Sequence, residues 1–173
     1  MCVLSRSNCA ELEAMVRFAD RLGVYVLFQP YHANKTGNPA PEPDSIVWRA
    51  EQALHLRKKA GNMMNSRSYL SGIERFLAQA GGKPCHAGFK YFSIDPFGYI
   101  HPCVDSPAVG HLLRDEITVL RSQRARQMVN ACRGCWYCFR GEADTSFSLT
   151  GCLEKARLAI AVLRRNAQAR RRG

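Results

Sequence analysis

The stretch CVLSRSNCAELEAMVRFADRLGVYVLFQP, residues 2–30, decides the fold class because its hydrophobic period changes twice. Residues 2–6 (CVLSR) form a short apolar run, and residues 24–30 (VYVLFQP) form a near-continuous one, as expected of a strand buried on both faces. Between them, apolar residues recur at helical spacing: Leu12, Met15, Val16, Ala19 and Leu22. Strand, helix and strand in this order predict a parallel pair joined by a right-handed crossover, and hence an α/β fold.

The ends of this helix and the elements that follow carry local signals. Asn8 is expected to cap the helix, with Glu11 three residues later completing a capping box, and Gly23 is expected to end it. Asn, Gly and Pro in residues 31–44 predict a loop. We predict further helices over residues 45–61 (capped by Asp44 and ended by Gly61), 66–82, 114–131 and 152–172.

Two features set the expected domain organisation. The composition changes at GGKP, residues 81–84, where we place a domain boundary. In the last predicted helix, Leu153, Ala156, Ile160 and Leu163 share one stripe, which predicts a core-facing side docked on the first part of the chain.

Length and cysteine content bound the class of protein. A compact chain of 173 residues buries roughly 70% of its unfolded surface, so it needs neither disulfides nor a metal merely to fold. No apolar run approaches the roughly 18 residues of a membrane span, and residues 1–14 lack the apolar stretch of a signal peptide. We therefore expect a cytoplasmic protein with no membrane partner. In a reducing compartment, eight cysteines favour metal binding or catalysis over disulfides.

The formal net charge is +11, and much of it lies in RRNAQARRRG, residues 164–173. A basic chain suggests nucleic acid or another anionic partner. However, an Arg-rich terminus is more often a solvated helix end, and the aromatic residues do not interleave with the basic ones as a base-stacking platform requires. Nucleic acid is therefore not the favoured partner, and membrane-surface binding through the last helix is a minor alternative.

The cysteines of the second half carry the chemistry. CHAGFKYFSIDPFGYIHPC, residues 85–103, has two strand-like runs around Asp95-Pro96-Phe97-Gly98, which suits a type I turn with a glycine bulge and predicts a hairpin. Gly88 would let the chain fold back and bring the sulfurs of Cys85 and Cys103 to one end. CRGCWYC, residues 132–138, then adds the thiols that complete a four-thiolate metal site: Cys132, Cys135 and Cys138.

The spacing discriminates between metals. Structural zinc usually binds two short-spaced cysteine pairs, whereas 17 residues separate Cys85 from Cys103. Iron–sulfur clusters accept scattered thiolates within an apolar wall, which nearby aromatic residues would supply: Phe89, Trp136, Tyr137 and Phe139. Spacing alone favours an iron–sulfur cluster over zinc and leaves inert cysteines as a third interpretation.

The pattern Cys85-x12-Gly98-x4-Cys103, followed after a gap by Cys132-x2-Cys135, resembles the auxiliary-cluster domain of radical SAM enzymes. That domain has a full form, SPASM, and a shortened form, twitch. The full form continues with x5 before the next cysteine and a close fourth one, whereas here Cys138 follows after two residues. The departure favours the shortened form, with one 4Fe–4S cluster. The resemblance implies that Cys85 and Cys103 are ligands, joined by Cys132 with Cys135 or by Cys135 with Cys138.

Residues 3–30 are similar to the fifth strand, fifth helix and sixth strand of the radical SAM partial barrel. The resemblance implies an incomplete parallel (β/α) barrel remnant at 1–80, a small hairpin-and-helix 4Fe–4S domain at 81–150 and a basic C-terminal helix at 151–173. The family's catalytic motif, Cys-x3-Cys-x2-Cys, does not occur in the sequence. We therefore expect the C-terminal part of a radical SAM enzyme, which alone does not cleave S-adenosylmethionine; that cofactor would bind only a full-length parent.

The implied role of the cluster is electron relay or positioning of a substrate, which would be a peptide or a small molecule. A partner chain that supplies the missing barrel half would also cover the exposed strand edges, which otherwise predict poor solubility. The alternative is a zinc-stabilised basic module that binds nucleic acid. We do not expect the other candidate residues to be ligands, and we interpret them as packing residues, surface residues or neighbours of the ligands: Cys2, Cys9, His86, His101, Cys152 and the Arg140-Gly141-Glu142 turn.

Overall fold

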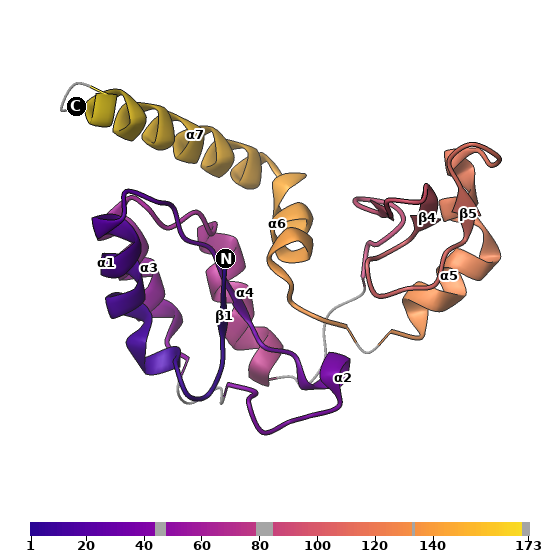
Figure 1. Ribbon diagram of the computed structural model, residues 1–173, viewed down its shortest axis with the longest axis horizontal. Coiled ribbons are helices and arrows are strands. Elements are labelled where there is room, and N and C mark those ends of the chain that lie inside the picture. The colour runs from indigo at the N-terminus through magenta and orange to yellow at the C-terminus, as the bar shows by residue number, and fades with distance from the viewer. Residues whose placement is uncertain (44–47, 79–84, 133, 171–173) are drawn as a thin grey trace. The chain divides into compact units, whose positions relative to one another are not determined.

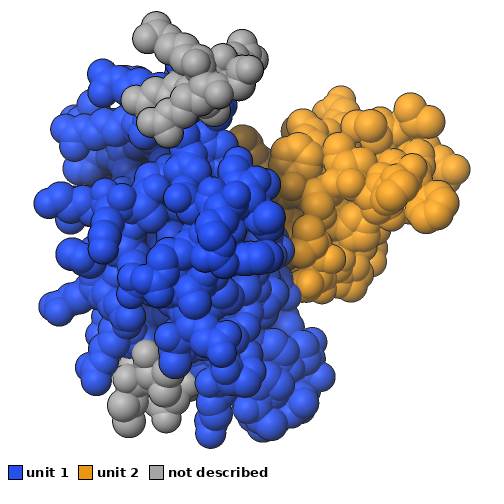
Figure 2. Space-filling model, turned by 60° about the vertical axis from the view of Figure 1, so that its left-hand side comes forward, with its two compact units in different colours: residues 1–80, 135–173 blue, residues 81–134 orange. Residues whose placement is uncertain are grey.

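A computed structural model describes residues 1–43, 48–78, 85–132 and 134–170, and it is a mixed α/β structure with small sheets (Figure 1). The chain divides into two compact units. The first unit comprises Met1–Ala80 and Cys135–Gly173, and the second comprises Gly81–Gly134 (Figure 2). The second unit ends at residue 134, so residues 135–150, which were expected to share a domain with residues 81–134, lie in the first unit.

The strand–helix–strand prediction is confirmed at the start of the first unit. Strands β1 (Cys2–Leu4) and β2 (Phe28–Pro30) pair in parallel, with Cys2 opposite Phe28, and α1 (Leu12–Arg21) connects them. A third extended segment, which the sequence did not indicate, follows the same direction: Val26 forms a parallel bridge with Met63. Three parallel segments therefore follow one another across this small sheet, in chain order.

Beyond the bridge at Met63, the side chain of Asn65 makes the hydrogen bonds that the backbone of a third strand would make to Phe28. Its amide oxygen accepts a hydrogen bond from the Phe28 N–H at 2.7 Å, and its amide nitrogen donates to the Phe28 carbonyl at 2.9 Å. Asn65 is fully buried. The side chain satisfies both backbone groups of a buried strand residue, as a neighbouring strand would.

The free edge of β1 is closed in a similar way. The Cys2 N–H and the Leu4 carbonyl bond to the β2 side, so the backbone groups of Val3 face the opposite edge. There the Asn8 side chain donates to the Val3 carbonyl at 3.0 Å and accepts from the Ser5 N–H at 2.8 Å. The predicted helix cap is therefore wrong. Asn8 makes no side-chain cap bond, and a 3-10 turn, η1 (Cys9–Glu11), precedes α1.

Helices α2 (Ala33–Thr36), α3 (Ala50–Ala60) and α4 (Arg67–Ala78) complete the first half of this unit. Asp44 lies outside the described residues, and α3 begins at Ala50 after Arg49, so the predicted start of this helix is wrong. Gly61 ends α3 in the left-handed conformation, with φ 67°, as predicted. The helix predicted over residues 66–82 is confirmed for its described part.

Helices α6 (Cys138–Ser146) and α7 (Leu149–Arg170) return the chain to the first unit. The sequence predicted α7 but not its orientation. The stripe expected to face the core is exposed: Leu153, Ala156, Ile160 and Leu163. The side of α7 that contacts the unit carries the half-buried Leu158 and Val162, and they lie between two ion pairs, Glu154 with Arg57 and Arg165 with Asp20.

The core of the first unit lies between the sheet and its helices. Fully buried side chains include Leu4, Phe28, Leu70 and Ile73. Helices α4 and α6 approach each other at two glycines: a methyl group on Gly72 would lie 2.1 Å from the Trp136 ring, and one on Gly141 would lie 2.5 Å from the Tyr69 ring. The two aromatic rings stack with centroids 5.8 Å apart. This contact fixes the segment around Trp136 against α4.

The second unit is built on the predicted hairpin, which is confirmed. Strands β3 (Ser93–Ile94) and β4 (Tyr99–His101) are antiparallel with Ile94 opposite Ile100, and Gly98 has φ 86°. A third strand that the sequence did not indicate, β5 (Gly110–His111), pairs with β4. The helix predicted over 114–131 is wrong as one element. It consists of η2 (Ile117–Arg121) and α5 (Gln123–Asn130), because Ser122 interrupts it and caps α5 by accepting from the Ala125 N–H.

The second unit has a small hydrophobic core. Among its described residues, the buried hydrophobic side chains are Ala87, Ile100, Leu120 and Ala125. Larger apolar side chains remain exposed: Phe89, Phe92, Phe97, Val104, Leu112, Leu113 and Ile117. Two of the four buried side chains are alanines, which contribute little apolar area. No described helix of either unit is long and apolar enough to cross a membrane.

Candidate functional site

The five cysteines predicted as ligands are divided between the two units. Cys85, Cys103 and Cys132 belong to the second unit, and Cys135 and Cys138 belong to the first. All eight cysteines of the chain are present as thiols. Each half of the predicted site is therefore described within its own unit.

Cys85 precedes a chain reversal at Gly88, as the sequence predicted. Gly88 has φ 77°, and its N–H donates to the Tyr91 carbonyl at 2.7 Å. The reversal places the Cys85 sulfur 2.9 Å from the Tyr91 hydroxyl, and Cys85 is half-buried. The neighbouring His86 is exposed, and its carbonyl accepts from the Phe89 and Lys90 N–H groups.

Cys103 lies just beyond the end of β4. Its N–H donates to the Ser106 hydroxyl at 2.9 Å, and its carbonyl accepts from the Ser106 N–H at 3.0 Å, so a tight turn fixes its backbone. Ser93 and His101 form the outermost pair of the hairpin, so Cys103 lies two residues beyond the paired part of β4 and Tyr91 lies two residues before that of β3. Tyr91 contacts Cys85, and the meeting of the Cys85 and Cys103 sulfurs stays a prediction.

Cys132 is exposed at the end of the second unit. Its sulfur accepts a hydrogen bond from the Gly134 N–H at 3.3 Å, and Gly134 has φ 84°. Backbone N–H bonds to sulfur are common at metal–thiolate centres and tune them. The contact at Cys132 is of that kind.

Cys135 and Cys138 enclose a segment that is fixed to the carboxyl end of β2. The Trp136 N–H donates to His32 Nε2 at 2.7 Å, and the Cys138 N–H donates to the Gln29 side-chain oxygen at 3.3 Å. Cys135 is buried, and so are Gln29 and His32. Burial raises the pKa of the Cys138 thiol, with the Glu142 carboxylate adding to the effect. In this conformation Cys138 is held as a thiol.

The residues after Cys138 form a buried polar network that the sequence did not indicate. Arg140 is fully buried, donates to the Cys135 carbonyl and lies 5.8 Å from the Trp136 ring centroid. Its guanidinium is 3.9 Å from the Asp144 carboxylate. Glu142 accepts from the Ser66 N–H at 2.7 Å, just before α4 begins, and pairs with Lys155. The expected turn with a salt bridge is thus a helix that joins α4 to α7.

The remaining cysteines have local roles. Cys9 is buried in the core of the first unit, where burial and then the nearby Cys2 raise its thiol pKa to about 11. Burial also raises the pKa of Cys2, whose sulfur lies 3.3 Å from the Met15 sulfur. Cys152 is exposed, and its thiol donates to the Ser146 carbonyl at 3.1 Å.

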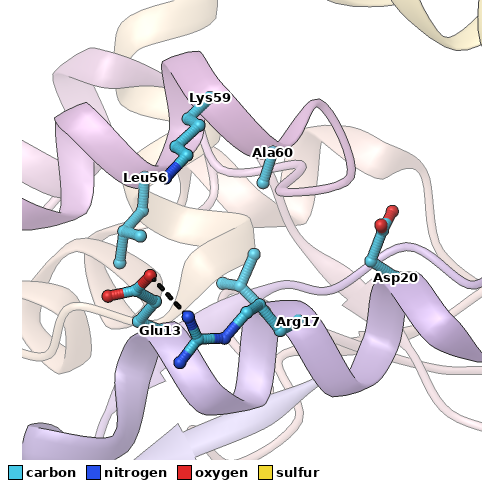
Figure 3. A pocket seen from close by; sticks show the side chains of 7 residues that line it. Glu13, Arg17, Asp20, Leu56, Lys59 and Ala60 are labelled. Atoms are coloured by element: carbon cyan, nitrogen blue, oxygen red, sulfur yellow. Dashed lines mark hydrogen bonds and ion pairs between the residues drawn. The ribbon is translucent and has the colours of Figure 1, made fainter.

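Each unit has a shallow pocket within its described residues. A pocket of about 190 Å³ in the second unit is lined by Cys85 and by residues of η2 and α5, including Leu120, Arg126 and Val129. A pocket of about 210 Å³ in the first unit lies between α1 and α3 (Figure 3). Its lining carries two charges of each sign, since Glu13 pairs with Arg17 at 3.0 Å and Asp20 and Lys59 also line it. Only the first of these pockets includes a predicted ligand.

Within the part of the chain that the structure describes, no three His, Cys, Asp or Glu side chains are arranged to hold a metal ion. Ligand cysteines need not be preassembled, because metal binding and folding are commonly one event. The donor set fits an iron–sulfur cluster in kind, since soft thiolates with backbone N–H donors are its usual ligands. No family model, curated protein or solved structure matches this chain.

Proposed function

We propose that the chain binds one 4Fe–4S cluster through Cys85, Cys103 and two of Cys132, Cys135 and Cys138. The observation that carries the proposal is the small core of the second unit, which holds three of these thiols. A domain of roughly 60 residues or fewer is only marginally stable by its core, and small natural domains commonly add disulfides, a metal or a partner. The cysteine thiols of this unit are the groups in it best suited to add stability in this way.

The hairpin favours a cluster over a structural zinc ion. The proposed ligands Cys85 and Cys103 flank a hairpin with a chain reversal at Gly88 between them, whereas zinc sites usually repeat a short Cys-x2-Cys loop. The Gly134 N–H bond to the Cys132 sulfur is of the kind that tunes cluster potentials. We prefer Cys132 and Cys135 as the remaining two ligands, because Cys135 directly follows the second unit in the chain. Cys135 with Cys138 is the alternative pair.

We further propose that the chain is the C-terminal region of a radical SAM enzyme, in which this auxiliary cluster relays electrons or positions a substrate. Two features support this proposal. One is the cysteine spacing, and the other is the succession of parallel extended segments in the first unit, which helices connect. The catalytic motif Cys-x3-Cys-x2-Cys is absent from the sequence, so cleavage of S-adenosylmethionine would require another polypeptide segment. A cytoplasmic location would keep the ligand thiols reduced.

Anaerobic reconstitution tests the proposal directly. The full chain, treated with ferrous iron and sulfide, should turn brown and retain about four iron and four sulfide per chain. Cys85→Ser and Cys103→Ser should each lose most of the iron, whereas Cys152→Ser, which changes an exposed cysteine, should retain it. A colourless protein that retains one zinc ion would overturn the cluster and favour the zinc-stabilised module.

A further inference from the structure

The outward side of α7 carries a narrow apolar stripe that the first unit does not cover. Its members are Leu149, Leu153, Ile160 and Leu163, exposed by 81, 54, 49 and 68%, with the small residue Ala156 between them. We call these five residues the α7 seam. Contiguous exposed apolar surface of this kind commonly marks an interaction site.

The opposite side of α7 is fixed to the first unit by polar contacts, so the seam faces away from it. Glu154 pairs with Arg57 at 3.2 Å near one end of the helix. Near the other end, Arg165 pairs with Asp20, and the Tyr25 hydroxyl donates to Asn166 at 2.9 Å. The helix is therefore held at two points, and a partner would meet a preorganised surface.

The spacing of the seam indicates the shape of its partner. Its residues follow one another by four, three, four and three positions, which is the a/d pattern of a coiled coil. The large apolar side chains are restricted to these positions, and only the small residues Cys152 and Ala159 lie beside them, so the stripe is narrower than the apolar face of a helix that packs into a globular core. It fits a second helix running alongside α7.

The residues beside the seam indicate the charge of the partner. Arg157 and Arg164 are exposed on one flank, each one position beyond a seam residue. The other flank is uncharged: Cys152, Ala159 and Asn166. The single acidic residue of α7 is Glu154, which is turned toward Arg57. A partner helix therefore meets a cationic flank with no carboxylate on it.

We propose that the α7 seam docks an amphipathic helix of a partner protein, with Leu or Ile in its seam and Glu or Asp opposite Arg157 and Arg164. Flanking charges of opposite sign set partner choice in such pairs. A second copy of this chain fits less well. Antiparallel pairing would set the Arg flank against itself, and parallel pairing would set it against the uncharged flank.

An anionic bilayer also fits less well than a helix. Interfacial helices combine a broad apolar face with basic residues free on the opposite side. Here the apolar stripe is narrow, and the opposite side of α7 is engaged with Arg57, Asp20 and Tyr25. The proposal does not depend on the cluster, because α7 belongs to the first unit.

Synthetic helices test the proposal on the full chain. One peptide of roughly three heptads would carry Leu at a and d and Glu at e and g, and its twin would carry Lys in place of Glu. The Glu peptide should bind about tenfold more tightly than the Lys peptide, because each Arg changes from attraction to repulsion. The Arg157→Glu, Arg164→Glu double variant should invert this preference. Fluorescence anisotropy of labelled peptides measures both affinities.

Further variants separate the seam from general stickiness. Leu153→Asp with Ile160→Asp should abolish peptide binding, whereas Leu113→Asp, which changes an 86% exposed leucine of the second unit, should not alter it. Equal binding of the two peptides, or failure of the charge swap to invert the preference, would overturn the proposal. So would seam-dependent dimerisation in sedimentation equilibrium, or seam-dependent binding to phosphatidylserine vesicles without peptide selectivity. Circular dichroism confirms that each variant is folded.

Discussion

The two units of this chain are stabilised by different means. The first unit buries large side chains in a contiguous core, among them Leu4, Phe28, Tyr69 and Ile73. The second unit buries two alanines, one isoleucine and one leucine among its described residues, and it leaves larger apolar side chains exposed. It also holds three cysteine thiols. Hydrophobic burial therefore contributes less to the second unit than to the first, and under our proposal the thiols of the second unit supply the remainder.

Removal of the proposed cluster should therefore produce the largest difference in stability between the two units. After reconstitution and then chelation under anaerobic conditions, amides of β3, β4 and α5 should lose protection from hydrogen exchange, whereas those of α1, α3 and α4 should keep it. Binding of a structural metal can supply about 10–16 kcal/mol of folding free energy, as zinc-finger peptides show. Hydrogen exchange followed by mass spectrometry resolves the two units. Equal protection of the second unit with and without iron would remove the distinction.

A matched pair of core truncations sharpens the comparison. Ile73 and Ile100 are both fully buried, one in each unit. Ile73→Ala should destabilise the first unit by about 2–5 kcal/mol, with or without the cluster. Ile100→Ala should reduce iron retention in the reconstituted protein, and it should leave the unfolding of the cluster-free protein unchanged because the second unit is then already unfolded. Denaturant unfolding monitored by far-ultraviolet circular dichroism, which senses both units, together with iron analysis, distinguishes these results.

Glycine substitutions test how tightly each unit is packed. A methyl group on Gly72 would lie 2.1 Å from the Trp136 ring, whose indole N–H is held by the Tyr69 carbonyl at 3.0 Å. Gly72→Ala should therefore destabilise the first unit by about 1–3 kcal/mol, although alanine favours a helix more than glycine does.

Gly110 of the second unit provides the matched control. A methyl group there would lie 2.9 Å from a Val119 methyl and 3.3 Å from Asp115, two side chains that are not fully buried and can move. Gly110→Ala should therefore change the hydrogen exchange of the second unit by less than about 0.5 kcal/mol, the range of ordinary surface substitutions. A larger loss at Gly110 than at Gly72 would reverse the expected contrast in packing.

Elements set by local rules could be predicted from the sequence. The alternation of period over residues 2–30 predicted β1, α1 and β2, and Asp95-Pro96-Phe97-Gly98 predicted the hairpin and its glycine bulge. Each depends on interactions within a few residues or on one hydrophobic face. The five candidate ligands were found in the same way, from spacing, and that spacing does not determine which unit each would join.

Contacts between distant parts of the chain could not be predicted. His32 and Gln29 bind backbone groups more than 100 positions away, and the burial of Arg140 depends on Trp136 and α4. The only signal was a polar Gln29 in an otherwise apolar strand. Helical period identified the α7 stripe, but it could not say which side faces the unit, because ion pairs at Glu154 and Arg165 decide that.

The estimate from chain length depends on how many domains the chain forms. A single compact domain of 173 residues would bury enough surface to need no metal, but the chain divides into two units. Each unit must then be judged by its own core. For the second unit that judgement changes, because Gly81–Gly134 is short and its buried side chains are few.

The smallest expected effect is the titration of the Asp95 carboxylate in the hairpin turn, which should affect the second unit alone. Desolvation acts to raise the pKa of Asp95, but hydrogen bonds from the Tyr99 and Phe97 N–H groups, both 2.9 Å from its carboxylate, and from His101 outweigh it and hold the pKa below the ordinary value of 3.8. Because the pKa of Asp95 is lower in the folded state than in the unfolded state, its carboxylate stabilises the turn at every pH above the unfolded-state pKa. This stabilisation is lost as pH falls through the lower, folded-state pKa. The amide NMR shifts of Phe97 and Tyr99 should therefore titrate with a midpoint below pH 3.8 for as long as the reconstituted unit remains folded. In Asp95→Ala both amides lose their acceptor, so their exchange should be faster at neutral pH. A midpoint at or above 3.8 in the wild type would show that the carboxylate does not hold the turn, and that the hairpin depends on its neighbouring thiols alone.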